Sequence, residues 1–165
     1  MSRPCIFFDR DGVVNLAPSA DEYYVLSPER LFIQPAWLDA LAIANQKGYA
    51  AVIVTNQKCV HKDLLTDAEL EGIHQVVWDA VHTRGLVLDG IYSATRGDED
   101  PDAKPKPGML LKAAAEHDLD LQRSWMIGDS ERDIEAGRRA GVAETVLIGL
   151  DFTLEALCER LAEKL

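Results

Sequence analysis

The chain has 165 residues, a formal net charge of −11 at pH 7, and 47% hydrophobic residues. This length and composition exclude wholesale disorder and predict a single domain, residues 1–165, with a substantial core. Because phosphate backbones and anionic bilayers demand clustered Lys and Arg, we expect neither nucleic acid nor a membrane as a partner.

The cysteines and the first residues indicate the compartment. Cys5, Cys59 and Cys158 lie far apart without a Cys-x-x-Cys pair, which is typical of a reducing environment and predicts no disulfide framework. The first residues lack the anatomy of a signal peptide, and no apolar run approaches the roughly 18 residues of a membrane span. We therefore expect a cytoplasmic protein. Separately, we expect it to work as a monomer.

Strands and helices are predicted to alternate along the chain. Apolar and β-branched runs predict the strands, whereas helical periodicity, capping residues and terminal glycines predict the helices. In chain order we expect a strand at 5–8, a helix at 36–47, a strand at 49–54, a helix at 66–84, a strand at 90–93, a helix at 108–117, a strand at 124–127, a helix at 133–140, a strand at 144–148 and a helix at 152–165. The polar segments 16–35 and 95–107 are expected to be long loops, which are often functional.

This alternation predicts a three-layer α/β fold with a Rossmann-like, doubly wound parallel sheet. In such sheets, ligands bind outside the carboxyl ends of the strands. Polar side chains follow several of the predicted strands, so we expect them to meet at one edge of the sheet: Asp9 and Asp11, Thr55 and Asn56, the loop with Lys104, and Asp129 with Asp133.

The residue types at these strand ends are suited to phosphoryl transfer. A carboxylate such as Asp9 can attack phosphorus, and Asp11 can protonate the leaving oxygen and later activate water. The developing negative charge needs cations and fixed donors, which Lys104 and Thr55 can supply. Mg²⁺ prefers one or two carboxylates with waters and substrate oxygens, and Asp9 and Asp129 can supply those carboxylates.

Each motif by itself also has an ordinary structural explanation. An Asp-x-Asp-Gly segment is a common loop, Thr55-Asn56 can cap a helix, Lys104 can be a solvated loop lysine, and a Gly-Asp-Ser-x-x-Asp segment can be a turn with a cap. Four such groups in this order, each after an apolar run, favour one shared site. Two alternatives remain: a receiver-like phosphoacceptor module, which carries its phosphorylated Asp on a later strand, and a scaffold that has lost catalysis.

Four segments of the chain resemble the four motifs of the haloacid dehalogenase (HAD) superfamily: residues 8–13, 54–57, 104–109 and 127–133. The resemblance spans residues 6–148 and implies a Mg²⁺-dependent phosphatase with Asp9 as nucleophile and Asp11 as general acid and base. It also implies phosphate contacts from Thr55 and Lys104. For the metal it implies Asp9, the Asp11 carbonyl and Asp129, with Asp133 beside these ligands.

Finer features resemble one branch of that superfamily. No large cap domain is inserted, and residues 11–15, 24–25 and 28–29 resemble the capless branch that contains heptose 1,7-bisphosphate phosphatases and histidinol-phosphate phosphatases. Residues 88–92 and the Lys-Pro-Lys-Pro-Gly-Met run favour the heptose enzymes. The resemblance implies a small phosphorylated metabolite as the substrate, a sugar phosphate or bisphosphate such as D-glycero-D-manno-heptose 1,7-bisphosphate, with these binding residues: Tyr24, Asn56, Gln57, Lys58 and Lys104.

The chain departs from that branch in the loop before Lys104. The branch usually carries a zinc loop there, whereas the corresponding positions are Ala94, Arg96, Asp100 and Asp102. Structural zinc is held by thiolates and imidazoles in a tetrahedral array, so we expect no structural zinc.

Two further departures lie where specificity is set. The family arginine before the lysine is Ala103 here, and Arg96 or Lys58 can substitute for it. In the second motif, Cys59 and His61 replace the usual residues, either as a nucleophilic dyad or as bystanders.

Overall fold

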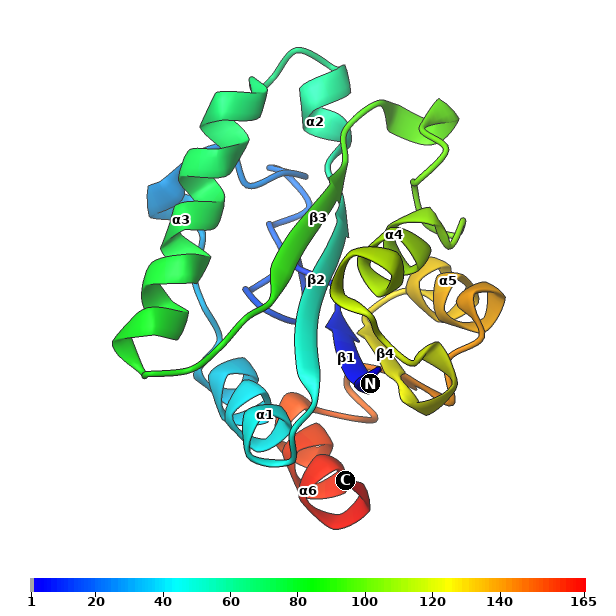
Figure 1. Ribbon diagram of the computed structural model, residues 1–165. Helices are drawn as coiled ribbons and strands as arrows, with labels where there is room; N and C mark the ends of the chain where they lie inside the picture. Colours follow the sequence, from blue (N-terminus) through cyan, green and yellow to red (C-terminus); the bar gives the residue numbers. More distant parts are fainter. Residues whose placement is uncertain (1) are drawn as a thin grey trace.

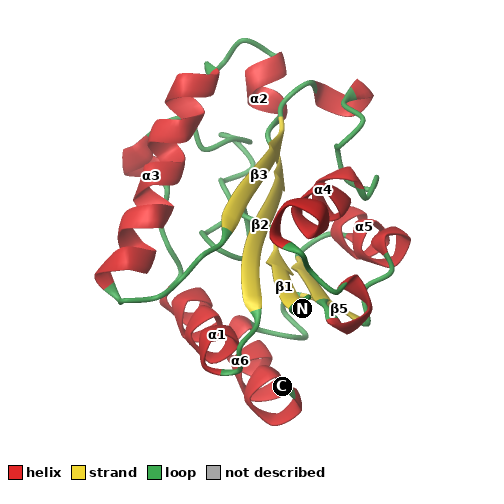
Figure 2. Cartoon of the chain, viewed as in Figure 1, coloured by secondary structure: helices red, strands yellow, loops and turns green. Residues whose placement is uncertain are grey.

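The computed structural model describes residues 2–165 as a parallel sheet with helices on both faces (Figures 1 and 2). Its strands are β1 (Cys5–Phe8), β2 (Ala50–Asn56), β3 (Gly90–Ala94), β4 (Trp125–Gly128) and β5 (Glu144–Leu147). They pair in the order β3-β2-β1-β4-β5, and every pairing is parallel. The predicted three-layer, doubly wound α/β fold is confirmed.

The helices divide between the two faces of the sheet. One face packs against α1 (Pro35–Gln46), α3 (Asp67–Thr83) and α6 (Leu154–Lys164), and the other against α4 (Gly108–His117) and α5 (Glu131–Ala140). The short α2 (Lys58–His61) follows β2, and single turns of 3-10 helix lie at Pro28–Arg30, Gly97–Glu99 and Leu121–Arg123. Among residues 2–165, no helix is both long enough and apolar enough to cross a membrane.

Successive side chains of the central strand enter different cores. Ile6 and Phe8 pack with α1, α3 and α6, whereas Cys5 and Phe7 pack with α4 and α5. All four are fully buried, because the helices cover both faces of the strand. A uniformly apolar run is therefore required at β1, and the first polar residue after it marks where the chain leaves the sheet.

Several boundaries differ from the sequence-based prediction. β2 continues through Asn56, so Thr55 and Asn56 end the strand rather than follow it. α5 begins at Glu131 instead of 133, because Ser130 is its N-cap and forms a reciprocal capping box with Asp133. The prediction missed α2, which at four residues is too short to show helical periodicity. The predicted capping box of Thr66 and Glu69 at the start of α3 is confirmed.

Candidate active site

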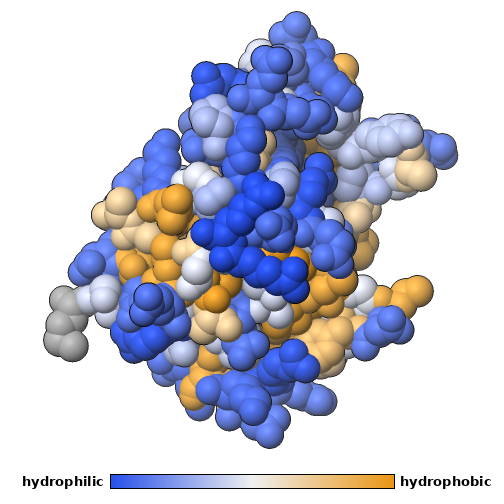
Figure 3. All heavy atoms as spheres, turned by 90° about the vertical axis from the view of Figure 1, so that its right-hand side faces the viewer, coloured by the Kyte–Doolittle hydropathy of each residue, from blue (hydrophilic) through white to orange (hydrophobic). Residues whose placement is uncertain are grey.

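The carboxyl ends of β1, β2 and β4 meet the loop before α4 at one hollow of about 220 Å³. The part of the surface at this end of the sheet is largely hydrophilic in the view of Figure 3. The side chains that line the hollow include all of the predicted catalytic and metal residues: Asp9, Asp11, Thr55, Lys104, Asp129 and Asp133. The structure thus brings together residues that lie up to 124 positions apart in the sequence, from Asp9 to Asp133.

Lys104 lies at the base of this hollow and is 5% exposed. Its Nζ donates to Asp9 Oδ1 at 2.8 Å and to the Val54 carbonyl at 2.9 Å, and it lies 2.6 Å from Asp133 Oδ1. These two carboxylates raise the pKa of Lys104 against the opposing effect of its burial. The ammonium is therefore a fixed positive charge beside Asp9.

Three carboxylates with one lysine leave an excess of negative charge in the hollow. One oxygen each of Asp9, Asp129 and Asp133 lie within 4.8 Å of one another. Burial raises the pKa of Asp9, and the carboxylates of Asp133 and Asp129 raise it further against the attraction of Lys104. Burial likewise raises the pKa of Asp129. A divalent cation among these oxygens would relieve both the repulsion and the desolvation, so this donor set fits Mg²⁺.

Asp133 is the carboxylate least available to a metal. Its Oδ2 accepts from the backbone N–H groups of Asp129 and Ser130 and from the Ser130 hydroxyl, each at 3.1 Å. Its Oδ1 is paired with Lys104. Both oxygens are thus engaged, and Asp133 holds the loop that carries Asp129. Asp133 thus lies beside Asp9 and Asp129, the two carboxylates that are predicted to hold the metal.

Gly12 allows Asp129 to approach the loop after β1. Its φ is +92°, a left-handed conformation that L-residues rarely adopt. A Cβ placed on Gly12 would collide with the Asp129 carboxylate. The glycine of the Asp-Arg-Asp-Gly segment is therefore required both by the turn and by the close contact of two acidic loops.

Hydrogen bonds from residues close to Asp11 in the fold fix the orientation of its carboxylate. Its Oδ1 accepts from Arg10 Nε and Nη2 at 3.0 and 2.8 Å and from Asn15 Nδ2 at 3.0 Å. Its Oδ2 accepts from Gln57 Nε2 at 3.2 Å. Gln57 was expected to bind substrate, but it is 1% exposed and also donates to Thr55 Oγ1 at 2.8 Å. Its side chain lines neither hollow of this region and instead orients Asp11 and Thr55.

A second hollow, of about 180 Å³, adjoins the first and shares Tyr24, Asn56 and Arg132 with it. Lys58 also lines it and pairs with Asp98 at 2.7 Å. The Lys58 ammonium holds the pKa of Asp98 below its usual range, and Arg132 and Lys106 add to this effect. Asp98 thus places a carboxylate among several cations. Ala103 also lines this hollow, at the position where the resemblance had implied an arginine.

The loop between β3 and α4 is organised by Asp100, a buried carboxylate. Its Oδ2 accepts from the backbone N–H groups of Thr95 and Arg96, both at 3.0 Å, and its Oδ1 from that of Asp102 at 2.9 Å. Burial opposes ionisation, yet these donors hold the pKa of Asp100 below its usual range. Lys106 Nζ donates to the carbonyls of Asp98 and Asp100 at 3.1 and 2.8 Å. Hydrogen bonds from side chains and backbone groups thus organise this loop.

The geometry favours the bystander interpretation of Cys59 and His61. Cys59 is fully buried, and its Sγ is 3.6 Å from Gln57 Oε1. Burial raises the pKa of its thiol, which disfavours the nucleophilic thiolate. His61 is exposed, and its ring lies against Gly97.

Three residues of this region escaped the sequence-based prediction. Arg10 is fully buried, and it contacts both Asp11 and His74 of α3. Arg132 lines both hollows from the first turn of α5. The only signal in the sequence was position: Arg10 lies between two motif aspartates, and Arg132 lies inside the Ser-x-x-Asp segment.

Comparisons with known proteins agree with this geometry. A family model described as HAD-hydrolase-like matches residues 101–164. The D-glycero-beta-D-manno-heptose-1,7-bisphosphate 7-phosphatase of Helicobacter pylori is 35% identical over 146 residues, which cover 87% of this chain and 82% of the relative. The corresponding enzyme of Bordetella bronchiseptica is 37% identical over 140 residues, covering 84% and 76%. A crystal structure of the B. bronchiseptica D,D-heptose 1,7-bisphosphate phosphatase, complexed with magnesium and phosphate, matches with a TM-score of 0.86, 30% identity, and 98% and 99% coverage.

The chain therefore belongs to the HAD-like hydrolases. Within them it is a phosphatase, a phosphoric monoester hydrolase, in the family of these heptose bisphosphate phosphatases. The sheet order independently excludes a receiver module, because the doubly wound sheet of receivers has the order 2-1-3-4-5.

Proposed function

We propose that this enzyme removes one phosphate from a sugar bisphosphate, D-glycero-D-manno-heptose 1,7-bisphosphate, with Asp9 as the nucleophile and Mg²⁺ as the cofactor. The contact that carries the proposal is that of Lys104 Nζ with Asp9 Oδ1 at 2.8 Å, in a hollow also lined by Asp11 and Asp129. The names of the relatives and the magnesium and phosphate of the B. bronchiseptica complex support both the substrate and the metal.

The reaction has two steps at Asp9. An oxygen of Asp9 attacks phosphorus while the ester P–O bond breaks, and Asp11 gives its proton to the leaving sugar oxygen. A water molecule then attacks the phosphorus of the aspartyl phosphate and gives a proton to Asp11, which releases phosphate and restores both carboxyl groups. Lys104 and Thr55 stabilise the phosphoryl oxygens.

The residues that would hold the metal are Asp9, Asp129 and the carbonyl of Asp11, with Asp133 fixing the loop of Asp129. When bound, Mg²⁺ supplies positive charge that lets a dianionic phosphate approach a cluster of carboxylates. The hydrogen bond from Lys104 orients the carboxylate of Asp9 for its attack on phosphorus.

The adjoining hollow accounts for a second phosphate on the substrate. Lys58 and Arg132 line it beside Asn56 and Tyr24, and a distal phosphate would take the place that the Asp98 carboxylate has beside Lys58. Histidinol phosphate, the alternative substrate, has no second phosphate and would bring a cationic amine towards Lys58 and Arg132. The bisphosphate is therefore favoured.

The proposal also concerns the state of the working enzyme. Residues 1–165 act as one catalytic unit, as a monomer in the cytoplasm, and without structural zinc. The free cysteines Cys5, Cys59 and Cys158 support a reducing compartment. The hydrogen bonds of Asp100 support a loop that needs no metal.

The substrate is tested by comparing kcat/KM for heptose 1,7-bisphosphate, histidinol phosphate and sugar monophosphates. We expect the bisphosphate to exceed each of the others by about tenfold or more. Equal or higher efficiency for histidinol phosphate would contradict the proposed substrate while leaving the phosphatase chemistry intact.

A further inference from the structure

Arg10 is a fully buried cation next to the catalytic loop, and its side chain is committed to two partners. Nε and Nη2 both donate to Asp11 Oδ1, and Nη1 lies 3.1 Å from Nε2 of His74. Burying a guanidinium is costly unless its charge is paired and its N–H groups are satisfied. This cost is offset here by the ion pair with Asp11 and by the hydrogen bond to His74 of α3.

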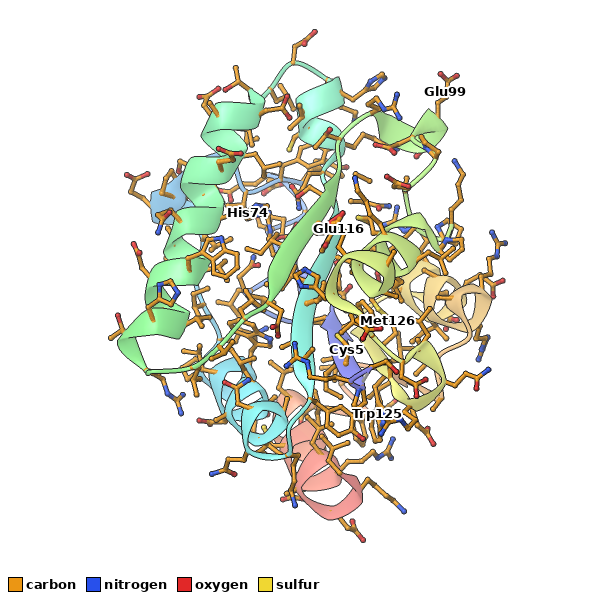
Figure 4. The ribbon with its side chains drawn as sticks, viewed as in Figure 1. Cys5, His74, Glu99, Glu116, Trp125 and Met126 are labelled. Carbon is orange, nitrogen blue, oxygen red and sulfur yellow. The ribbon has the colours of Figure 1, made fainter. Side chains whose placement is uncertain are left out.

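We infer that His74 is a positioning residue of the phosphatase reaction, which acts through Arg10 to hold the carboxylate of Asp11. The inference rests on the proposed role of Asp11 as the acid and base. His74 lies in α3, 64 residues from Arg10 in the sequence, and faces the interior of the molecule (Figure 4). It lines neither hollow, so it acts without touching the substrate.

The chemistry of the contact defines the state of His74. A guanidinium only donates hydrogen bonds, so Nε2 must accept and the ring must be neutral, with its proton on Nδ1. His74 is 7% exposed, and the charged groups facing it are Arg10 and the carboxylate of Asp11. Burial and the Arg10 charge lower the pKa of His74, in keeping with a neutral acceptor.

The hydrogen bonds to Asp11 show what this arrangement accomplishes. Oδ1 accepts three N–H donors, two from Arg10 and one from Asn15, whereas Oδ2 accepts one from Gln57. A proton on Oδ1 would point at these donors, so the transferable proton belongs on Oδ2. Arg10, steadied by His74, therefore determines which oxygen of Asp11 is free for proton transfer and in which direction it points.

The inference is tested with three substitutions of His74. His74→Gln keeps an acceptor at the position of Nε2, His74→Asn carries the same amide one bond shorter, and His74→Leu removes the acceptor. We expect kcat to fall about 10- to 100-fold in His74→Leu and His74→Asn with little change in KM, and to stay within about threefold in His74→Gln. His82→Leu, an exposed position of the same helix, serves as the control and should keep wild-type kcat.

A pre-steady-state measurement separates positioning from a general structural effect. With 4-nitrophenyl phosphate the leaving group needs no proton, so His74→Leu should release about one nitrophenolate per chain in a burst before the slowed second step. Circular dichroism and titration with Mg²⁺ should match the wild type. A wild-type kcat in His74→Leu, or an equal loss in His74→Gln and His74→Leu, would overturn the inference. A wild-type rate in Asp11→Asn would instead overturn the proposed function.

Discussion

The side chain of Asn56 makes hydrogen bonds to both backbone polar groups of Lys104. The Lys104 N–H donates to Asn56 Oδ1 at 2.9 Å, and Asn56 Nδ2 donates to the Lys104 carbonyl at 3.0 Å. The end of β2 is thus joined to the lysine loop 48 residues further along the chain. Lys104 in turn reaches Asp9, so the position of the proposed nucleophile depends on this pair.

The first prediction concerns this link. Asn56→Ala should lower the free energy of unfolding by about 1–3 kcal/mol, because two partly buried hydrogen bonds are lost. It should lower kcat by about tenfold, because Lys104 is no longer held against Asp9. Urea unfolding and steady-state kinetics measure the two effects. A loss of stability with wild-type kcat would show that Asn56 supports the loop but not the placement of Lys104.

The second prediction concerns the loop of Asp100. Asp100→Ala should lower the free energy of unfolding by about 2–4 kcal/mol and should raise KM, because three backbone N–H groups near the second hollow lose their acceptor.

The same view of this loop predicts that elemental analysis of the wild-type chain finds no stoichiometric zinc. One tightly held zinc per chain would contradict the view that Asp100 organises this loop.

The third prediction concerns selectivity for two phosphates. Arg132→Met should lower kcat/KM for the heptose bisphosphate about tenfold more than for a sugar monophosphate, since a distal phosphate loses a cation. Asp98→Asn should act in the opposite direction, because it removes a negative charge that competes for Lys58. If both variants changed the two substrates equally, the second hollow would not be the site of the distal phosphate.

The fourth prediction follows from His74, whose pKa is lowered to about 3 by burial first and by Arg10 second. In the unfolded chain this imidazole titrates near pH 6.5. Between about pH 6.5 and 3 the unfolded chain therefore binds a proton that the folded chain does not, and the stability of the folded state falls as the pH falls. His74→Gln lacks this titration.

The measurement is chemical unfolding of both proteins between pH 7 and pH 4. The wild type should lose stability relative to His74→Gln as the pH is lowered. A difference that stays constant over this range would show that His74 is not held neutral by its surroundings.

Much of the fold and the site could be predicted because each signal was local. The run Cys5–Phe8 is apolar on both faces and ends at Asp9, so both the strand and the polar residue at its end are visible in the sequence. The same holds for β4 and Asp129. Parallel strands then bring their ends to one edge.

The remaining features depend on contacts between distant segments. A charged residue such as Arg10 is almost never fully buried, and its partner His74 lies on a helix whose packing no local pattern specifies. Gln57 was expected at the substrate because it follows Asn56 in a motif, but its side chain turns inward to Asp11. The direction of one side chain on a short irregular segment is decided by tertiary packing alone.

The fifth prediction concerns the proposed metal and Asp11, the proposed acid and base. Removing Mg²⁺ with EDTA should abolish turnover, and adding Mg²⁺ should restore it, because three carboxylates near one phosphate need a counter-charge. Asp11→Asn should slow both formation and hydrolysis of the aspartyl phosphate, since the leaving oxygen loses its acid and water its base. A change in substrate affinity alone would contradict this role of Asp11.

The central claim is that phosphate passes through Asp9. The most direct measurement is rapid acid quench during turnover, followed by mass spectrometry of the peptide that contains Asp9, in the wild type, Asp11→Asn and Asp9→Asn. We expect a phosphorylated Asp9 in the wild type, more of it in Asp11→Asn if hydrolysis is slowed more than formation, and neither turnover nor phosphorylation in Asp9→Asn. Phosphate on another residue, or wild-type activity in Asp9→Asn, would contradict the account.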